Sequence, residues 1–234
     1  MADVCTGYWY LIHRQGSDAQ SFFRVEDFGG KAINLSDRTK DVSGAGTGAR
    51  DFALTREGGR PVLFVLNANN TIVRSTDNGN TFETVMVKSG GNMVPAKFSG
   101  AWIATDPNRS DIIYIGQTGK VLKYDLNTGE QENLSEGLPS VSCDDLIFHE
   151  GTGDLYFFSN CVGIYLRDHA TGQWNLWMTG YNPLAAKRVA LNYTTQEMVL
   201  GDYGRGVWVA DLEHPADRYF SDGFKLRQLS AVNG

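Results

Sequence analysis

The sequence lacks both long apolar runs and basic clusters. No stretch approaches the roughly 20 apolar residues that a membrane-spanning helix needs, so membrane insertion is not expected. No run of Lys or Arg occurs, and the formal net charge of the 234 residues is −6. Because nucleic-acid binders present a basic surface to the phosphate backbone, a nucleic-acid partner is not expected either.

Motifs of catalysis, cofactor binding and metal binding are also scarce. The sequence has no Gly-x-Ser-x-Gly elbow, phosphate-binding loop or dinucleotide fingerprint, so no cofactor is expected. The four histidines lack the spacing of zinc ligands and are interpreted as surface or core residues: His13, His149, His169 and His214. No transition-metal site is therefore predicted. Three cysteines are too few to hold a small fold together by disulfides.

Turn-forming and apolar residues are abundant instead. Apolar residues make up 41% of the chain and aromatic residues 12%, which is enough for a substantial core. The chain has 27 glycines but only 6 prolines, and many Asn, Asp, Ser and Thr residues accompany them. These residues tolerate positive φ or bond their own backbone, so they favour tight turns. The composition therefore predicts many short strands.

A unit of four short strands repeats along the chain. Each unit contains a strand, a hairpin, a second strand, a short loop, a third strand, a polar turn and a fourth strand. The repeats span about 51–86, 101–135, 144–178 and 188–229. Repetition at this period predicts an all-β fold, a β-propeller of four-stranded antiparallel blades. A β-sandwich also has many short strands, but it does not repeat one unit in order.

The N-terminal region predicts a partial blade over about 8–36. It contains three expected strands, at Tyr8–His13, Phe22–Val25 and Lys31–Leu35. Completion would need a strand from around Phe224–Leu229 or from sequence outside this chain. Residues 1–234 are therefore interpreted as one propeller domain, with about five blades or as a segment of a seven- or eight-bladed ring. Strands inside such a fold should be continuously apolar, as Ile112–Ile115, Leu155–Phe158 and Val207–Val209 are.

One turn resembles the Asp-box of BNR-repeat propellers of the sialidase-like, sortilin and xyloglucanase types. It runs Ser75-Thr-Asp77-Asn-Gly79-Asn-Thr81-Phe82. The Asp carboxylate is expected to accept backbone N–H groups, the glycine to take a positive φ and Phe82 to pack between blades. Asp125–Gly129 and Asp168–Trp174 occupy the same place in later repeats and look like degenerate copies.

Two further segments resemble parts of large bacterial surface and secreted propellers. Gly201–Trp208 contains a Tyr-Gly-Arg-Gly-Val-Trp run, and Asn133–Pro139 is similar to a connection between blades. The resemblance covers about residues 50–212 and implies an extracellular or cell-surface protein. Met1–Cys5 lacks the features of a signal peptide, so an exported protein would appear here in mature, trimmed or recombinant form. These families include hydrolases, receptors and scaffolds, so the resemblance does not fix the function.

Cys143 and Cys161 lie at equal distances from the expected hairpin centre near Thr152. Directly opposed residues on antiparallel strands have Cα atoms about 4.5–5.5 Å apart, within disulfide reach. The alternatives are a Cys143–Cys161 disulfide, which is typical of an oxidising compartment, and two buried thiols. In the first case Cys5 is left unpaired or bonded to a segment outside this chain.

A glycoside hydrolase, sialidase-like or xyloglucanase-like, is the catalytic alternative. It would need two carboxylates about 5–10 Å apart across a cleft. The candidates for such a pair are Asp144, Asp145, Glu150 and Asp202. Calcium is a further alternative at the oxygen-rich residues Asp106, Asn108, Ser110 and Asp111, which also suit an ordinary turn.

Two kinds of polar loop form the predicted binding face. One kind joins the second and third strands of each unit, and the other joins successive units near Met93–Lys97, Pro139–Ser142 and Tyr181–Lys187. Their tentative ligand-binding residues are Asn69, Gln117, Asn160, Asp202, Tyr203 and Arg205. Planar polar groups beside aromatics suit sugar hydroxyls or an extended peptide, although Tyr203 and Arg205 also fit a structural role between blades. The sequence thus favours a non-catalytic extracellular module that binds a glycan or a protein. A purely architectural role within a multidomain adhesin or filament is the remaining alternative.

Overall fold

The computed structural model describes residues 2–3, 7–15, 19–26, 30–46, 48–160, 162–177, 186–202, 206–212 and 227–228. Nearly all regular structure in these residues is β-strand, and their only helix is a 3-10 turn at Ser36–Arg38. None of the described segments forms a helix of the length and apolarity needed to cross a membrane.

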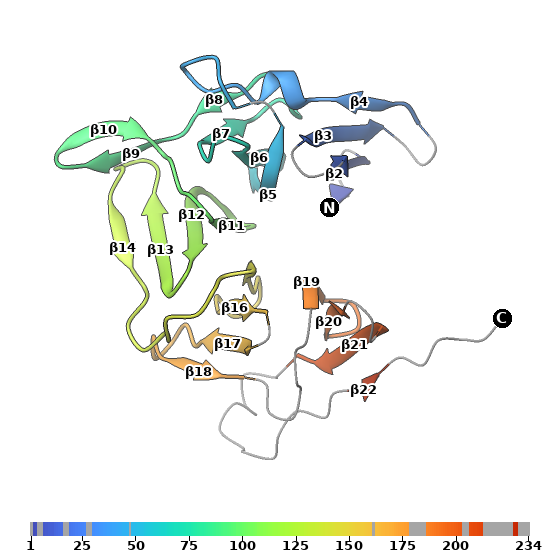
Figure 1. Ribbon diagram of the computed structural model, residues 1–234, viewed down its shortest axis with the longest axis vertical. Coiled ribbons are helices and arrows are strands. Elements are labelled where there is room, and N and C mark those ends of the chain that lie inside the picture. The colour runs from blue at the N-terminus through green and yellow to red at the C-terminus, as the bar shows by residue number, and fades with distance from the viewer. Residues whose placement is uncertain are drawn as a thin grey trace. The chain divides into compact units, whose positions relative to one another are not determined.

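The strands form five four-stranded antiparallel sheets, the blades of a β-propeller (Figure 1). In each blade the strands are hydrogen-bonded in chain order. Blades 1 and 2 contain β1 (Ala2–Asp3), β2 (Tyr8–Gln15), β3 (Ala19–Glu26), β4 (Ala32–Asn34), then β5 (Ala49–Glu57), β6 (Arg60–Asn67), β7 (Ile72–Ser75) and β8 (Glu83–Thr84). The predicted all-β propeller with about five blades is therefore confirmed.

The later blades follow the same order. Blade 3 contains β11 (Trp102–Asp106), β12 (Arg109–Gln117), β13 (Lys120–Asp125) and β14 (Gln131–Asn133). Blade 4 contains β15 (Asp145–Phe148), β16 (Leu155–Ser159), β17 (Gly163–Arg167) and β18 (Trp174–Leu176). Blade 5 contains β19 (Ala186–Asn192), β20 (Glu197–Asp202), β21 (Gly206–Asp211) and β22 (Arg227–Gln228).

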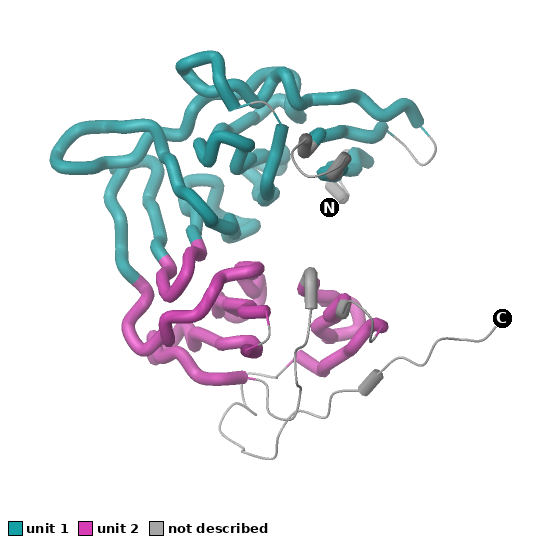
Figure 2. The backbone as a smooth tube through the Cα atoms, viewed as in Figure 1, with its two compact units in different colours: residues 1–115, 122–133 teal, residues 116–121, 134–234 magenta. Residues whose placement is uncertain are grey.

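The chain divides into two compact units (Figure 2). Unit 1 comprises residues 1–115 and 122–133, and unit 2 comprises residues 116–121 and 134–234. Unit 1 has one apolar cluster between blades 1 and 2, around Phe22 and Leu63, and another that includes Phe64 and Ile113. In unit 2, the cluster between blades 4 and 5 includes Phe158 and Leu200.

The inner strands are apolar on both faces, as the sequence predicts. Ile112–Ile115 and Leu155–Phe158 are buried throughout, with no side chain more than 9% exposed. The expectation for Val207–Val209 is wrong in part, because Val207 is 41% exposed while Val209 is buried. Val207 follows the exposed Gly206 at the start of β21, where the strand emerges from its loop.

Blade 1 is a complete four-stranded sheet rather than the partial blade that the sequence suggested. Its additional strand is β1, which pairs with β2 through Ala2 opposite Trp9 and Asp3 opposite Tyr8. The late strand β22 instead pairs with β21 in its own blade, with Gln228 opposite Trp208. The two-residue β1 is too short to produce a periodic signal, which is why the sequence did not reveal it.

A β-hairpin between blades 2 and 3 is an addition to the repeat. It consists of β9 (Met86–Ser89) and β10 (Asn92–Pro95), joined by Gly90 and Gly91, which both have positive φ. The sequence placed Met93–Lys97 in a loop. Figure 1 shows the hairpin beside the end of β13 and β14, and the Lys88 N–H donates to the Gly129 carbonyl there at 2.8 Å.

Candidate functional site

The Ser75–Phe82 turn is held by the Asp77 carboxylate. The Thr81 N–H and hydroxyl donate to it at 2.9 and 2.7 Å, and the Ser75 hydroxyl donates at 2.8 Å. Ser75 Oγ in turn accepts the Gly79 N–H at 2.9 Å. Partial burial raises the pKa of Asp77, but the hydrogen bonds from Thr81 and Ser75 outweigh it and bring the pKa below the ordinary value. The turn therefore favours an ionised Asp77.

The same turn is fastened to blade 1. Gly79 has φ +82°, and a Cβ added there would lie 2.7 Å from the Leu35 side chain. The buried Arg24 donates to the Asn78 carbonyl at 2.6 Å, and Phe82 packs against the cluster between blades 1 and 2. These contacts assign the turn a structural role between neighbouring blades.

In unit 1, the predicted ligand residue Asn69 belongs to a hydrogen-bonded loop cluster. Its amide nitrogen donates to Asp41 at 2.8 Å, and its amide oxygen accepts the Thr71 hydroxyl at 2.6 Å. Hydrogen bonds from Ser43 and then from Asn69 lower the pKa of Asp41 to about 2. These hydrogen bonds fix the half-buried Asn69 side chain in place. Its partner Asp41 was not identified from the sequence.

In unit 2, the β12–β13 loop contacts the connection between blades 3 and 4. Gln117 is half-buried at the end of β12, and the Gly119 N–H two residues later donates to the Val141 carbonyl at 2.8 Å. A Cβ added at Gly119 would lie 2.9 Å from the Ser140 Cα. This close approach of two backbones requires glycine, and it places the Gln117 loop against residues 140–141.

Asn160, in the β16–β17 loop, is joined to the same connection. Its N–H donates to the Asp144 carboxylate at 2.8 Å, and Asp144 also accepts the Ser142 hydroxyl at 2.8 Å. The Ser142 and Ser159 hydroxyl oxygens lie 3.3 Å apart. Residues 140–144 therefore link the Gln117 and Asn160 loops into one polar surface of unit 2, which we call the loop face.

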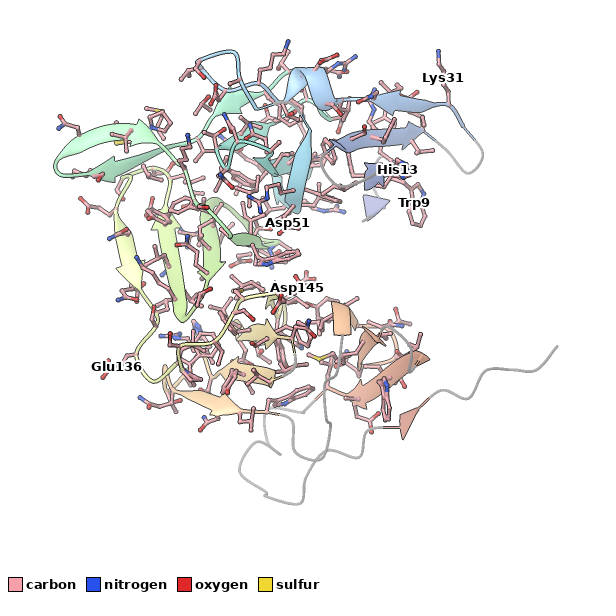
Figure 3. The ribbon with its side chains drawn as sticks, viewed as in Figure 1. Trp9, His13, Lys31, Asp51, Glu136 and Asp145 are labelled. Atoms are coloured by element: carbon pink, nitrogen blue, oxygen red, sulfur yellow. The ribbon has the colours of Figure 1, made fainter. Side chains whose placement is uncertain are left out.

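Of the candidate catalytic carboxylates, Asp144 and Asp145 support the backbone. Glu150 is exposed, and its N–H donates to the Tyr193 hydroxyl oxygen at 3.0 Å. Asp145 is buried and accepts the N–H of Leu146 at 3.0 Å and that of Val189, on the next blade, at 3.3 Å. Asp51 has the same position in blade 2, where it accepts the Ile103 N–H at 2.9 Å. Figure 3 labels Asp51 on β5 and Asp145 on β15. In both cases an aspartate on the first strand of one blade accepts a backbone N–H from the first strand of the next blade, which links the two strands.

The calcium candidates are bonded within their own turn. Asp106 accepts the Asn108 N–H at 2.8 Å, as in an ordinary Asx turn. Arg109 forms a bidentate pair with Asp111, with contacts of 2.8 and 2.7 Å, and this pair lowers the pKa of the Asp111 carboxyl. A guanidinium at this position repels a cation. Nowhere in the described ranges do three His, Cys, Asp or Glu residues group as metal ligands.

Several predicted site residues lie outside the described part of the chain. These are Tyr203, Arg205 and Cys161, and of Asp202 only the backbone is described. The expected register at Cys143 is off by one residue, because Asp145 pairs with Phe158 and Phe148 with Leu155. Extending this ladder places buried Cys143 opposite Asn160. The Cys143–Cys161 disulfide remains a prediction. The argument that the two cysteines lie directly opposite each other no longer supports it.

Comparisons with known proteins identify the fold. No protein-family model matches the chain, and no curated protein matches its sequence. The crystal structure of TolB from Acinetobacter baumannii is similar, with a TM-score of 0.55 and 13% sequence identity. The match covers 87% of this chain and 49% of the TolB chain, so this chain spans about half the length of that structure. At this identity the similarity shows a β-propeller and no more.

Proposed function

We propose that this chain is a non-catalytic, extracellular binding or scaffolding module that holds a glycan or protein ligand on the loops between second and third strands. It would act as part of a larger secreted or cell-surface protein. The Asp-box resemblance of the sequence motivates the extracellular setting. The propeller fold supports a binding role, because its blades present loops of variable sequence on a rigid β scaffold.

The observation that carries the proposal is the hydrogen-bonded loop face of unit 2. Gly119 and Asn160 both donate hydrogen bonds to the connection at residues 140–144, and Ser142 donates to Asp144 within it, so the two loops are held before any ligand arrives. Preorganised loops reduce the entropic cost of binding. Amide and hydroxyl groups dominate this surface, and such groups pair well with sugar hydroxyls or with a peptide backbone.

The carboxylates of this region support a non-catalytic reading. A glycosidase needs one acid free to protonate a leaving group and a second free to act as nucleophile or base. Asp144 instead accepts bonds from Ser142 and Asn160, and buried Asp145 accepts two backbone N–H groups. Asp144 therefore holds the loop face together, and Asp145 joins the first strands of blades 4 and 5.

A glycan array combined with a hydrolysis screen tests this proposal. Gln117→Ala and Asn160→Ala should weaken binding of an array hit about fivefold or more, since each removes polar contacts at the loop face. Asn108→Ala, at the opposite end of the blade 3 sheet, is the matched control and should bind like the wild type. Release of sugar that Asp144→Asn abolishes would instead establish the hydrolase alternative.

A further inference from the structure

A pocket of about 290 Å³ lies in unit 1, apart from the loop face. The pocket is open on one side and is lined by the β9–β10 hairpin, the segment that follows it and the outer strands of blade 3. Its lining includes Lys88, Lys97, Phe98, Tyr124 and Gln131. This volume lies just below the usual range for ligand sites, about 300–1,000 Å³, so the pocket suits a small molecule with one ring.

Two aromatic residues of the pocket lining are buried and pack against each other. Phe98 and Tyr124 are each at most 9% exposed, and their ring centroids lie 5.4 Å apart. The hairpin is fixed over them through the Lys88 N–H bond to Gly129, where a Cβ would lie 2.9 Å from the Met93 sulfur. This hydrogen bond and close contact join the hairpin to the turn between β13 and β14.

The pocket also presents hydrogen-bonding groups of both kinds. The Tyr124 hydroxyl donates to the Gln131 amide oxygen at 2.8 Å. Burial raises the pKa of the Tyr124 phenol, so this proton is retained at neutral pH. The bond leaves the amide N–H groups of Gln131 available as donors and the Tyr124 oxygen available as an acceptor.

The two lysines contribute one uncompensated positive charge. The Lys88 ammonium pairs with Glu130 at 2.6 Å, which cancels its charge locally. Lys97 is exposed and forms no ion pair with any residue in the described ranges. A ligand that balances the pocket therefore carries a single negative charge.

We propose that this pocket binds a carboxylated monosaccharide of the hexuronic acid class. The carboxylate would pair with Lys97 and accept from Gln131, and a ring hydroxyl would donate to the Tyr124 oxygen. A neutral sugar would leave the Lys97 charge unmatched. A phosphorylated sugar would bring a second negative charge beside Glu130 and is disfavoured for that reason.

NMR titration of the ¹⁵N-labelled full chain with sodium glucuronate tests the proposal. Saturable shifts are expected at amides of residues 86–98, 124 and 131. Lys97→Gln should weaken binding about fivefold, the effect of one solvent-screened ion pair. Gln131→Leu should also weaken it. Lys120→Gln replaces another exposed lysine and is the matched control, so its affinity should equal that of the wild type.

One neutral analogue, glucose, and one doubly charged analogue, glucose 6-phosphate, complete the design. Glucose should bind more weakly than glucuronate, and glucose 6-phosphate should not exceed glucuronate at pH 7.5. The proposal is overturned if glucuronate produces no shifts, if the shifts map to the loop face, if glucose binds equally well, or if Lys97→Gln binds like the wild type. The loop face does not include this pocket, so these results leave the proposed function to its own test.

Discussion

Replacement of Asp77 by Ala should destabilise the protein through the turn between β7 and β8. The carboxylate accepts three hydrogen bonds, two from Thr81 and one from Ser75, at 2.7–2.9 Å. The same turn presents the Asn78 carbonyl to Arg24 of blade 1. Loss of the carboxylate therefore loosens the turn and, through it, a contact between two blades.

The size of this effect follows from the number of bonds. A typical intramolecular hydrogen bond contributes about 0.5–1.5 kcal/mol net. Thr81 is exposed, so its two donors find water in the variant, whereas the buried Ser75 hydroxyl loses its acceptor. Three bonds at the lower end of the range give about 2 kcal/mol. For a chain of this size that corresponds to a fall of about 4–8 °C in the midpoint of thermal unfolding.

Urea and thermal unfolding followed by tryptophan fluorescence, together with hydrogen exchange at the Thr81 amide, measure the effect. Asp77→Ala should lower both midpoints and speed exchange at Thr81. Asp77→Asn keeps one acceptor oxygen and should lose about half as much. Thr76→Ala changes an exposed side chain of the same turn and serves as the control. Midpoints of Asp77→Ala that equal those of the control would refute the reasoning.

The acid dependence of this difference gives a second readout. The folded state lowers the pKa of Asp77, so its stabilisation is fully present above the unfolded-state pKa of about 3.9 and is lost as pH falls through the folded value. At fixed ionic strength, the difference in unfolding midpoint between wild type and Asp77→Ala should be constant from pH 5 to pH 8. It should shrink below about pH 4.

Three other predictions concern the core, a loop and the cysteines. Phe157→Ala should cost about 3–5 kcal/mol in urea unfolding because Phe157 is fully buried, and a loss below that of Asp77→Ala would contradict it. Hydrogen bonds, chiefly from Ser43, lower the pKa of Asp41 to about 2, so the ionised carboxylate stabilises the fold. The thermal midpoint of Asp41→Asn should therefore lie below that of wild type at pH 5. The two midpoints should converge as the pH falls from 3.8 to about 2. If Cys143 and Cys161 form a disulfide, thiol titration of the unreduced, denatured chain should find one reactive thiol among its three cysteines, whereas three would exclude the bridge.

The blades were predictable because their signals are local. Each repeat contains apolar runs of strand length separated by glycine or polar turns, and the observed strands of blades 2 to 5 follow those runs closely. The weaker features depend on distant pairing. β1 has two residues and exists only through its bonds to β2, and the β9–β10 hairpin required reading Gly90-Gly91 as a turn between two short alternating runs.

The candidate site was predictable in outline but not in detail. The loops that carry Gln117 and Asn160 do meet the same connection, as strand order implies. The partners that fix these loops come from elsewhere in the sequence, so no local pattern identifies them. Asn69 donates a hydrogen bond to Asp41, which lies 28 residues earlier in the sequence. The strand register at Cys143 differs from the expected one by a single residue.

Several acidic side chains of this chain accept hydrogen bonds that hold turns and loops together, which is the basis of the proposed non-catalytic role. Asp77 organises a turn, Asp51 and Asp145 tie successive first strands, and Asp144 fastens the loop face. For Asp77 these hydrogen bonds lower the pKa, so this carboxyl is poorly suited to act as a general acid at neutral pH. Under the proposed function, amide and hydroxyl groups of the loop face would meet the ligand, while Asp144 would hold the loops in place.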